Sequence, residues 1–198
     1  MSYDIDLRDP VSGKVLDLPC EHTMTGGTYR AYVDQVTGEF RKLPISEAHL
    51  NITYNYSSYY YKVTDGDPRF ANIGSDDSVQ YGIRGIYGKT GAESIQMLED
   101  MIERIRREYT TEDGKWIQTQ RTRAGYRCKL TGAMVDAVEG FMHNLSSNPD
   151  WERQEWRESV SEGPCDDYWE ATAGNALRPL YQLLAMARLR PDGVWDGD

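Results

Sequence analysis

Residues 50–56 read Leu50-Asn51-Ile52-Thr53-Tyr54-Asn55-Tyr56, and this stretch decides the fold class more clearly than any other part of the chain. Its apolar and aromatic residues alternate with the polar residues Asn51, Thr53 and Asn55. Successive side chains of a β-strand point to opposite faces of the sheet, so the alternation predicts a strand with one buried face and one polar face.

The residues before this strand also favour β structure. Short alternating runs at 3–9 and 14–18 flank a turn that ends in Gly13, and runs at 29–34 and 40–43 flank a turn that ends in Gly38. Glycine can adopt the backbone angles that tight hairpin turns require. The amino-terminal part is therefore predicted to form antiparallel hairpins and a sheet.

The residues after the strand change character twice. Residues 57–82 carry turn signals and little hydrophobic periodicity, which predicts an exposed loop. Thr90 and Glu93 then have the spacing of a capping box, in which the two side chains satisfy backbone donors at a helix start. Apolar residues behind them follow a helical spacing, which predicts an amphipathic helix that ends near Tyr109.

Two further amphipathic helices are expected, at 131–145 and at 172–189. A cationic hairpin is expected at 115–130, and the acidic stretch 150–170 could attract it within the fold. The predicted fold class is α+β, with amino-terminal antiparallel β hairpins and sheet followed by three amphipathic helices.

Composition excludes several classes of protein. A length of 198 residues supports one domain, and a net charge of −10 argues against a protein that holds nucleic acid mainly through its phosphates. No apolar run is long enough for a membrane span, and the amino end does not resemble a signal peptide. The odd, widely spaced set Cys20, Cys128 and Cys165 indicates reduced thiols, so we expect a cytoplasmic protein.

One pattern points to a phosphate. Gly88-Lys89-Thr90 resembles the end of a phosphate-binding loop, but Ile83 stands where the full pattern needs a glycine. Arg84, Lys89 and the amides at the start of the Thr90 helix would still form a local anion site, because a helix amino terminus carries partial positive charge. The alternative is a helix cap with two solvated cations.

The polar face of the predicted strand points to a base or a ribose. Amide and hydroxyl groups of Asn51, Thr53 and Asn55 can both donate and accept hydrogen bonds. Tyr56, Tyr59 or Trp169 could stack on a flat ring, since the 14 tyrosines bias the aromatic set toward rings with a polar edge. The alternative is an ordinary solvent-facing sheet surface with tyrosine-rich packing.

Other constellations carry weaker signals. Cys20 and His22 do not have the paired spacing of a structural zinc site. They also do not form a convincing nucleophile and base, because no third residue would orient the histidine. The acidic carboxyl-terminal region could bind a divalent cation or accept from ribose hydroxyls, or form caps and a frayed tail. No catalytic residue, metal or cofactor is assigned.

Three strings stand in one order in the chain: residues 50–56, residues 82–95 and residues 167–198. Together they resemble a family of small phage and prophage accessory proteins. The resemblance also takes in His22 and residues 24–28, and it covers about half of the chain. Residues 110–163 depart from shorter members, which implies an insertion into a single domain of residues 1–198.

The resemblance implies an accessory phage protein that acts in the host cytoplasm. Many such proteins counter bacterial defence, and one strategy is to sequester nucleotide-derived immune signals without cleaving them. We therefore expect a non-enzymatic protein that binds a small nucleotide-type ligand, with no membrane and no non-specific nucleic acid as partner. Homo-oligomerisation stays open. The expected ligand contacts are Asn51, Thr53, Asn55, Tyr56, Tyr59, Arg84, Lys89, Thr90, His22, Gly26, Gly27, Thr28, Trp169 and Trp195.

Two alternatives belong to other classes. A nucleotide hydrolase or transferase would use Asp167, Asp192 or Asp196 with a metal, or His22. An acidic inhibitor of a host defence protein would use the net negative charge.

Overall fold

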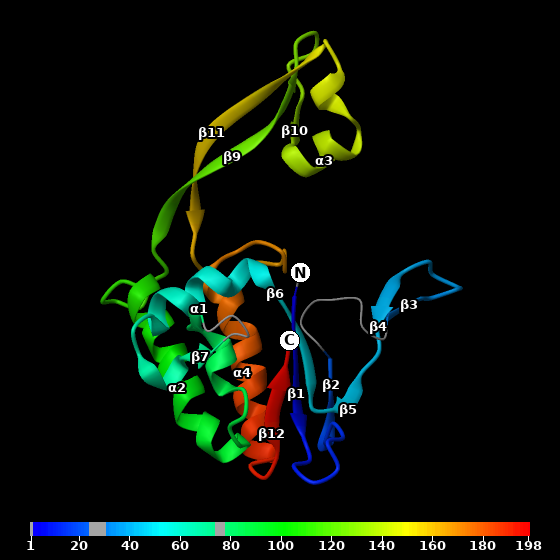
Figure 1. Ribbon diagram of the computed structural model, residues 1–198. Helices are drawn as coiled ribbons and strands as arrows, with labels where there is room; N and C mark the ends of the chain where they lie inside the picture. Colours follow the sequence, from blue (N-terminus) through cyan, green and yellow to red (C-terminus); the bar gives the residue numbers. More distant parts are fainter. Residues whose placement is uncertain (1, 24–30, 74–77) are drawn as a thin grey trace. The chain divides into compact units, whose positions relative to one another are not determined.

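The computed structural model describes residues 2–23, 31–73 and 78–198 (Figure 1). The chain divides into two compact units: unit 1 comprises Met1–Lys115 and Gly163–Asp198, and unit 2 comprises Trp116–Glu162. The fold is mixed α+β, as predicted. No helix in the described ranges is long and apolar enough to cross a membrane.

The central sheet of unit 1 has strand β1 (Ser2–Arg8) in the middle, with β12 (Val194–Gly197) on one side and β6 (His49–Thr53) on the other. Both neighbours are antiparallel to β1. Tyr3, Ile5 and Leu7 are fully buried, so β1 turns one face to the core. The carboxyl-terminal residues thus form a sheet strand, and the alternative of a frayed tail is wrong because their backbone pairs with β1.

Short strand pairs complete the β structure of unit 1. Strand β2 (Asp17–His22) pairs with β5 (Ile45–Glu47), β3 (Ala31–Val33) with β4 (Phe40–Lys42), and β7 (Asn72–Ile73) with β8 (Val79–Gln80). The second predicted hairpin is confirmed by β3 and β4. The first is reduced to one bridge between Arg8 and Val15, because β2 leaves β1 and pairs with β5 instead.

The predicted strand at 50–56 is too long by three residues. Strand β6 ends at Thr53, whose hydroxyl accepts from the Asn55 amide and caps the 3-10 turn η1 (Tyr54–Tyr56). Helix α1 (Ser57–Thr64) follows, so the loop expected at 57–82 is wrong in its first third. Tyr59 and Tyr60 are buried, and their packing stabilises a helix that periodicity did not predict. Turns η2 (Pro68–Phe70) and η3 (Ile83–Ile86) follow.

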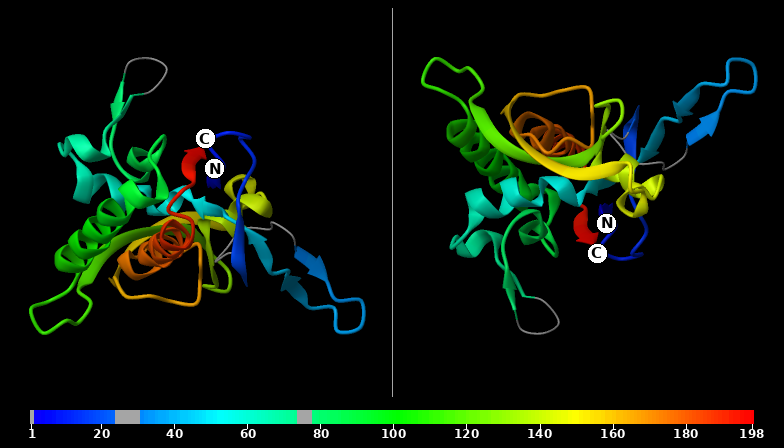
Figure 2. Two further views of the ribbon diagram at one scale, coloured as in Figure 1. Left: turned by 90° about the horizontal axis from the view of Figure 1, so that it is seen from below. Right: turned by 90° about the horizontal axis from the view of Figure 1, so that it is seen from above.

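Two long helices cover the sheet of unit 1, and they lie side by side in both views of Figure 2. Helix α2 (Gly91–Tyr109) begins at the predicted capping box, with both reciprocal hydrogen bonds present. Helix α4 (Ala173–Leu189) begins after Thr172, whose hydroxyl accepts from the Asn175 amide. Leu98 and Ile105 of α2 and Leu180 of α4 are buried, so both predicted helices are confirmed with their apolar faces inward.

Unit 2 consists mainly of two long antiparallel strands, β9 (Gln118–Cys128) and β11 (Trp151–Ser161). Strand β10 (Met134–Asp136) pairs with the other edge of β9, followed by α3 (Ala137–Met142) and the turn η4 (Leu145–Ser147). The hairpin expected at 115–130 is wrong, because β9 continues without a turn along a partner of equal length. The helix expected at 131–145 begins only at Ala137, after β10.

The cationic and acidic stretches pack against each other in unit 2, as one interpretation of the sequence predicted. Arg123 Nε lies 2.7 Å from Glu158 Oε1, and Arg121 lies 2.9 Å from Glu162 Oε1. Glu162 is 3 % exposed and also accepts from the Thr119 hydroxyl at 2.7 Å. These ion pairs tie β9 to β11, because a buried carboxylate without such partners would be costly.

Candidate functional site

The amides at the start of α2, predicted as an anion site, are already bonded within the protein. The Thr90 amide donates to Glu93 Oε2 at 2.8 Å, and the Glu93 amide donates to Thr90 Oγ1 at 3.2 Å. The Gly91 and Ala92 amides donate to the backbone oxygens of Gly193 and Pro191, at 2.8 and 3.1 Å. An anion at this helix start would have to displace these bonds. Lys89 is held in place by its backbone oxygen, which accepts from the Trp195 amide at 2.9 Å.

Arg84 joins several parts of unit 1. Its Nε donates to the backbone oxygen of Asp198 at 2.9 Å, and its Nη2 donates to the Tyr54 hydroxyl. The guanidinium carbon lies 5.1 Å from the centre of the Tyr3 ring and 5.4 Å from that of Tyr54, which allows cation–π attraction to both. The Arg84 guanidinium therefore connects β1 and η1 to the residue that follows β12.

The polar residues of the predicted strand do not share one open face. The Asn51 amide donates to Asp4 Oδ1 at 2.6 Å, and the Thr53 backbone amide donates to the Tyr168 hydroxyl at 3.1 Å. Asn55 lies in the 3-10 turn and donates to the backbone oxygen of Trp169 at 2.8 Å. The Thr53 and Asn55 bonds attach the end of β6 and the turn after it to the segment that precedes α4, whereas the Asn51 bond joins β6 to β1.

Most of the rings predicted to stack on a ligand belong to the core. Tyr56 and Tyr59 are buried and donate to the backbone oxygens of Tyr168 and Ala171. Burial raises the pKa of the Tyr56 phenol. Trp195 is 1 % exposed and donates to Ser94 Oγ at 2.7 Å, whereas Trp169 is 59 % exposed. Trp169 is therefore the accessible ring among the three predicted to stack, and Trp195, predicted only as a ligand contact, is buried.

His22 lies at the end of β2, where its Nε2 is 2.8 Å from the backbone oxygen of Glu47. With Cys20 and residues of α4 it lines a small cavity of about 100 Å³. Gly26, Gly27 and Thr28 lie outside the described residues. The ligand contacts assigned from the sequence stay predictions.

The carboxylates of the hydrolase alternative are engaged separately. Asp192 pairs with Arg190 at 2.9 Å, and Asp196 pairs with Arg8 at 3.0 Å. Asp167 Oδ1 accepts from the Trp169 amide at 2.9 Å. Within the described ranges, no group of three or more His, Cys, Asp or Glu residues could hold a metal ion.

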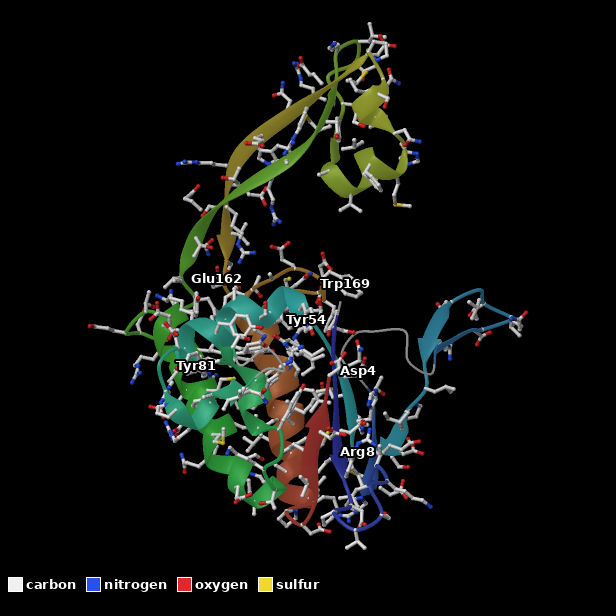
Figure 3. The ribbon with its side chains drawn as sticks, viewed as in Figure 1. Asp4, Arg8, Tyr54, Tyr81, Glu162 and Trp169 are labelled. Carbon is white, nitrogen blue, oxygen red and sulfur yellow. The ribbon has the colours of Figure 1, made fainter. Side chains whose placement is uncertain are left out.

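A larger cavity of about 490 Å³ is lined by residues from α1 and β8 and the residues next to them, including two tyrosines. It is lined by Tyr61, Lys62, Asp65, Gln80 and Tyr81. We call it the aromatic pocket. Figure 3 marks Tyr81 and Tyr54 in this part of unit 1. The Tyr61 ring is partly exposed, and its hydroxyl lies 3.3 Å from that of Tyr3.

Gly82 allows the aromatic pocket to form. Its φ of +105° is rarely adopted by other residues, and a Cβ there would lie 2.8 Å from the Tyr61 ring. The backbone can therefore pass close to Tyr61 and place Tyr81 on the pocket wall only because residue 82 has no side chain.

A second cavity of about 330 Å³ shares one lining residue with the first, and three cations and one carboxylate line it. The lining residues of this cationic groove are Lys62, Val63, Arg104, Arg107 and Glu108. Lys62 lines both cavities and lies 2.6 Å from Glu108 Oε1, which raises the pKa of the ammonium group. Arg107 forms no ion pair with the part of the chain that the structure describes, so its charge is available to a ligand.

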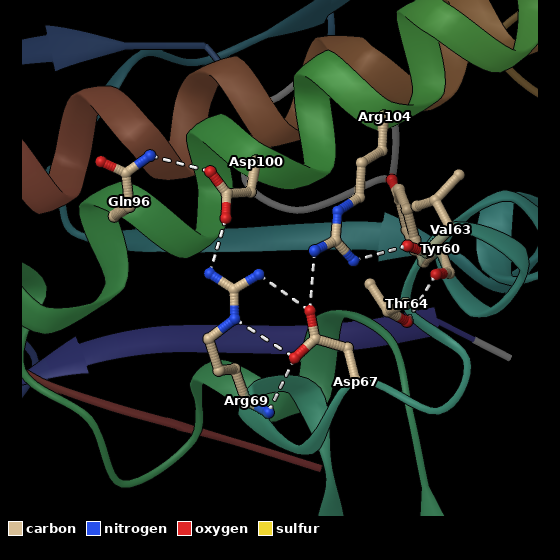
Figure 4. Close-up of polar contacts among 8 residues, drawn as sticks. All are labelled: Tyr60, Val63, Thr64, Asp67, Arg69, Gln96, Asp100 and Arg104. Atoms are coloured by element: carbon tan, nitrogen blue, oxygen red, sulfur yellow. Dashed lines mark hydrogen bonds and ion pairs between the residues drawn. The ribbon is translucent and has the colours of Figure 1, made fainter.

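Asp67 fixes the position of Arg104 in the wall of the groove. It accepts from Arg104 Nη2 at 2.7 Å and from Arg69 Nη2 at 2.8 Å, and Arg69 also donates to Asp100 at 2.6 Å (Figure 4). Arg104 donates further to the backbone oxygen of Val63 at 3.0 Å. The guanidinium groups of Arg69 and then Arg104 hold the pKa of Asp67 well below its usual range. The network thus fixes α2 against the end of α1.

Sequence reasoning missed most of these residues. Lys62, Gln80 and Tyr81 were not among the predicted ligand contacts, because residues 57–82 were read as a loop. Arg104 and Arg107 lie in the predicted helix α2, but they were not assigned to a ligand. One signal was present: Arg104 and Arg107 are three residues apart, so they lie on the same side of the confirmed helix α2.

No family model matches the chain, and no curated protein and no solved structure matches it. The resemblance to phage accessory proteins stays a prediction. The chemistry of the two cavities therefore has to be inferred from their own residues.

Proposed function

We propose that the protein binds a small nucleotide-type ligand in the aromatic pocket and the cationic groove, and that it does not cleave this ligand. The observation that supports the proposal is that Lys62 lines both cavities. A ligand with a flat ring at one end and phosphate at the other would place each end in a chemically matched cavity.

The aromatic pocket suits the ring of such a ligand. Tyr61 and Tyr81 offer ring faces, and base stacking on an aromatic side chain is worth about 1–3 kcal/mol. Gln80 can donate and accept, and Asp65 can accept from an amino group or a ribose hydroxyl.

The cationic groove suits phosphate. Arg107 and Lys62 can both donate charge-assisted hydrogen bonds to phosphate oxygens, and Arg104 is fixed beside them by Asp67. In a chain of net charge −10, a cationic groove next to aromatic rings favours an anionic ligand over a neutral one.

The resemblance to phage accessory proteins supplies a biological setting for the proposal. In that setting, the bound molecule would be a nucleotide that bacterial immune systems use as a signal. Binding without cleavage would lower its free concentration in the host cytoplasm.

Calorimetric titration with cyclic dinucleotides and ADP-ribose derivatives tests the proposal. We expect Tyr81→Ala and Arg107→Ala each to weaken binding by about tenfold or more, from lost stacking and a lost phosphate contact. Tyr181→Ala and Arg106→Ala are matched controls, since both residues are exposed in unit 1 and line neither cavity. Both controls should bind like the unchanged protein.

Recovery of the ligand after incubation separates binding from catalysis. A chemically intact ligand supports sequestration, whereas turnover that EDTA abolishes would favour the hydrolase alternative. Absence of binding to every compound of both classes would refute the proposed function.

A further inference from the structure

Strand β11 of unit 2 has an edge to which no strand of the described residues is paired. The sheet order is β10-β9-β11, so β9 has two neighbours and β11 has one. All 11 residues of β11 pair with β9 without a register shift. The strand contains no proline and no bulge, two of the devices by which proteins protect a long exposed edge, and its charged side chains, a third device, carry both signs.

The hydrogen bonds at both ends of the ladder reveal which residues face this edge. The Glu162 amide donates to the Ile117 oxygen at 3.0 Å, and the Lys129 amide donates to the Asp150 oxygen at 2.8 Å. In an antiparallel pair, every second residue bonds to the partner strand. Even-numbered residues therefore bond to β9. Arg153, Glu155, Arg157 and Ser159 turn their backbone N–H and C=O groups outward.

We propose that this edge binds the same edge of a second copy, with the two β11 strands antiparallel about a two-fold axis at Trp156. In this register Glu155 lies opposite Arg157 of the second copy, and Arg157 lies opposite its Glu155. Opposite charges in direct cross-strand pairs stabilise a sheet, and the symmetry produces this pair twice.

Charge selects this register over its neighbours. An axis at Glu155 or at Arg157 would place two like charges directly opposite each other. An axis at Gln154 would also pair Arg153 with Glu155, but it would need the Trp151 amide, which already donates to the Asn148 oxygen at 3.0 Å.

The residues of the proposed contact are not needed by the strand pair within the chain. Glu155 lies opposite Ala124 and Arg157 lies opposite Thr122, so neither faces a charge on β9. Glu155 pairs only with the exposed Arg153 at 3.2 Å, a contact that contributes little. A further strand would also stabilise the sheet, because β10 pairs with only three residues of β9 and a two-stranded antiparallel pair is marginal in water.

The test measures the mass of the full chain by sedimentation equilibrium over the micromolar range, since the small contact area fits a weak dimer. We expect the unchanged protein to dimerise. Glu155→Arg alone and Arg157→Glu alone should each weaken dimerisation by about tenfold or more, because each places like charges opposite each other twice. Mixing the two variants should restore dimers, since each then meets its complement. Glu112→Arg, an exposed residue of unit 1, is the control with the same charge change.

Three results would overturn the proposal. The first is an unchanged protein that stays monomeric throughout the range. The second is a dimer that neither charge reversal weakens, and the third is a mixture of the two variants that stays monomeric. Circular dichroism of both variants establishes that unit 2 remains folded.

Discussion

Asp67 links the shape of the candidate site to single side chains. Its Oδ2 accepts from both Arg69 and Arg104, its Oδ1 accepts from Arg69, and Arg104 in turn lines the cationic groove. Charge-assisted bonds of this kind are stronger than neutral ones, and they also fix the direction in which a guanidinium points. Asp67 therefore positions Arg104 in the groove, although Asp67 does not line the groove itself.

Replacement of Asp67 should lower stability in a pH-dependent way. Arg69 and Arg104 hold the pKa of Asp67 below its usual range, so the unfolded chain takes up a proton first as pH falls. The contribution of Asp67 is present above about pH 4 and is lost below it. Asp67→Asn should cost about 1–3 kcal/mol at pH 7 and less at pH 3 in urea unfolding. Equal losses at both pH values would contradict this. Asp166→Asn, at an exposed position, is the control.

Gly82 is the residue on which the aromatic pocket depends for its shape. Gly82→Ala should destabilise the protein more than Gly66→Ala does, although both glycines have positive φ. At Gly66 a Cβ meets open space, so that variant shows the backbone cost alone, about 1–2 kcal/mol. At Gly82 the backbone cost is larger, because φ +105° and ψ −152° lie in a region that essentially only glycine adopts, and the contact with Tyr61 adds to it. Thermal unfolding of both variants measures the difference, and equal losses would contradict the special role of Gly82.

At the scale of elements, the predictable parts of the fold were those with local signals. The capping box and the helical spacing behind it identified α2, and Gly38 marked the β3–β4 hairpin. The end of β6 was not predictable, because Tyr54 and Tyr56 continue the alternation while Thr53 caps a turn. The candidate site was missed for the same reason, since α1 supplies Tyr61 and Lys62.

The capping box of α2 should be measurable as an element. Thr90→Ala removes the hydroxyl that accepts from the Glu93 amide, and we expect a loss of about 1 kcal/mol in the free energy of unfolding. Thr90→Ser keeps that acceptor and should lose much less. If both variants unfold alike, the hydroxyl does not stabilise the helix start, and the packing of the Thr90 methyl group does.

At the scale of the whole molecule, the two units differ in how much apolar surface they bury. Cys128 and Leu145 are the buried apolar residues of unit 2, whereas α2 and α4 of unit 1 together bury more than ten residues. The opposite charges of the two stretches predicted that they could pack together, but the individual ion pairs could not be predicted, because they join residues far apart in the sequence. The net charge of −10 likewise conceals a local cationic groove.

The rates of amide hydrogen exchange should therefore differ between the two units. Amides of β9 and β11 should exchange about tenfold or more faster than those in the middle of α2 and α4, because few apolar contacts oppose local opening of the ribbon. Mass spectrometry of peptides from the full chain measures this. Equal protection would show that something other than buried apolar residues stabilises β9 and β11. Repeating the measurement at a lower protein concentration would then show whether pairing between two copies is the cause.

The position of β1 between β6 and β12 also constrains the order of folding. During synthesis, β1 is made well before its partner β12, so one edge of β1 stays open while the residues between them are made. Ile5 and Leu7 lack their final cover during that time. Contacts between such distant parts of a chain form slowly, and an open apolar strand invites aggregation. The nascent chain is therefore expected to depend on chaperones until β12 has been made and pairs with β1.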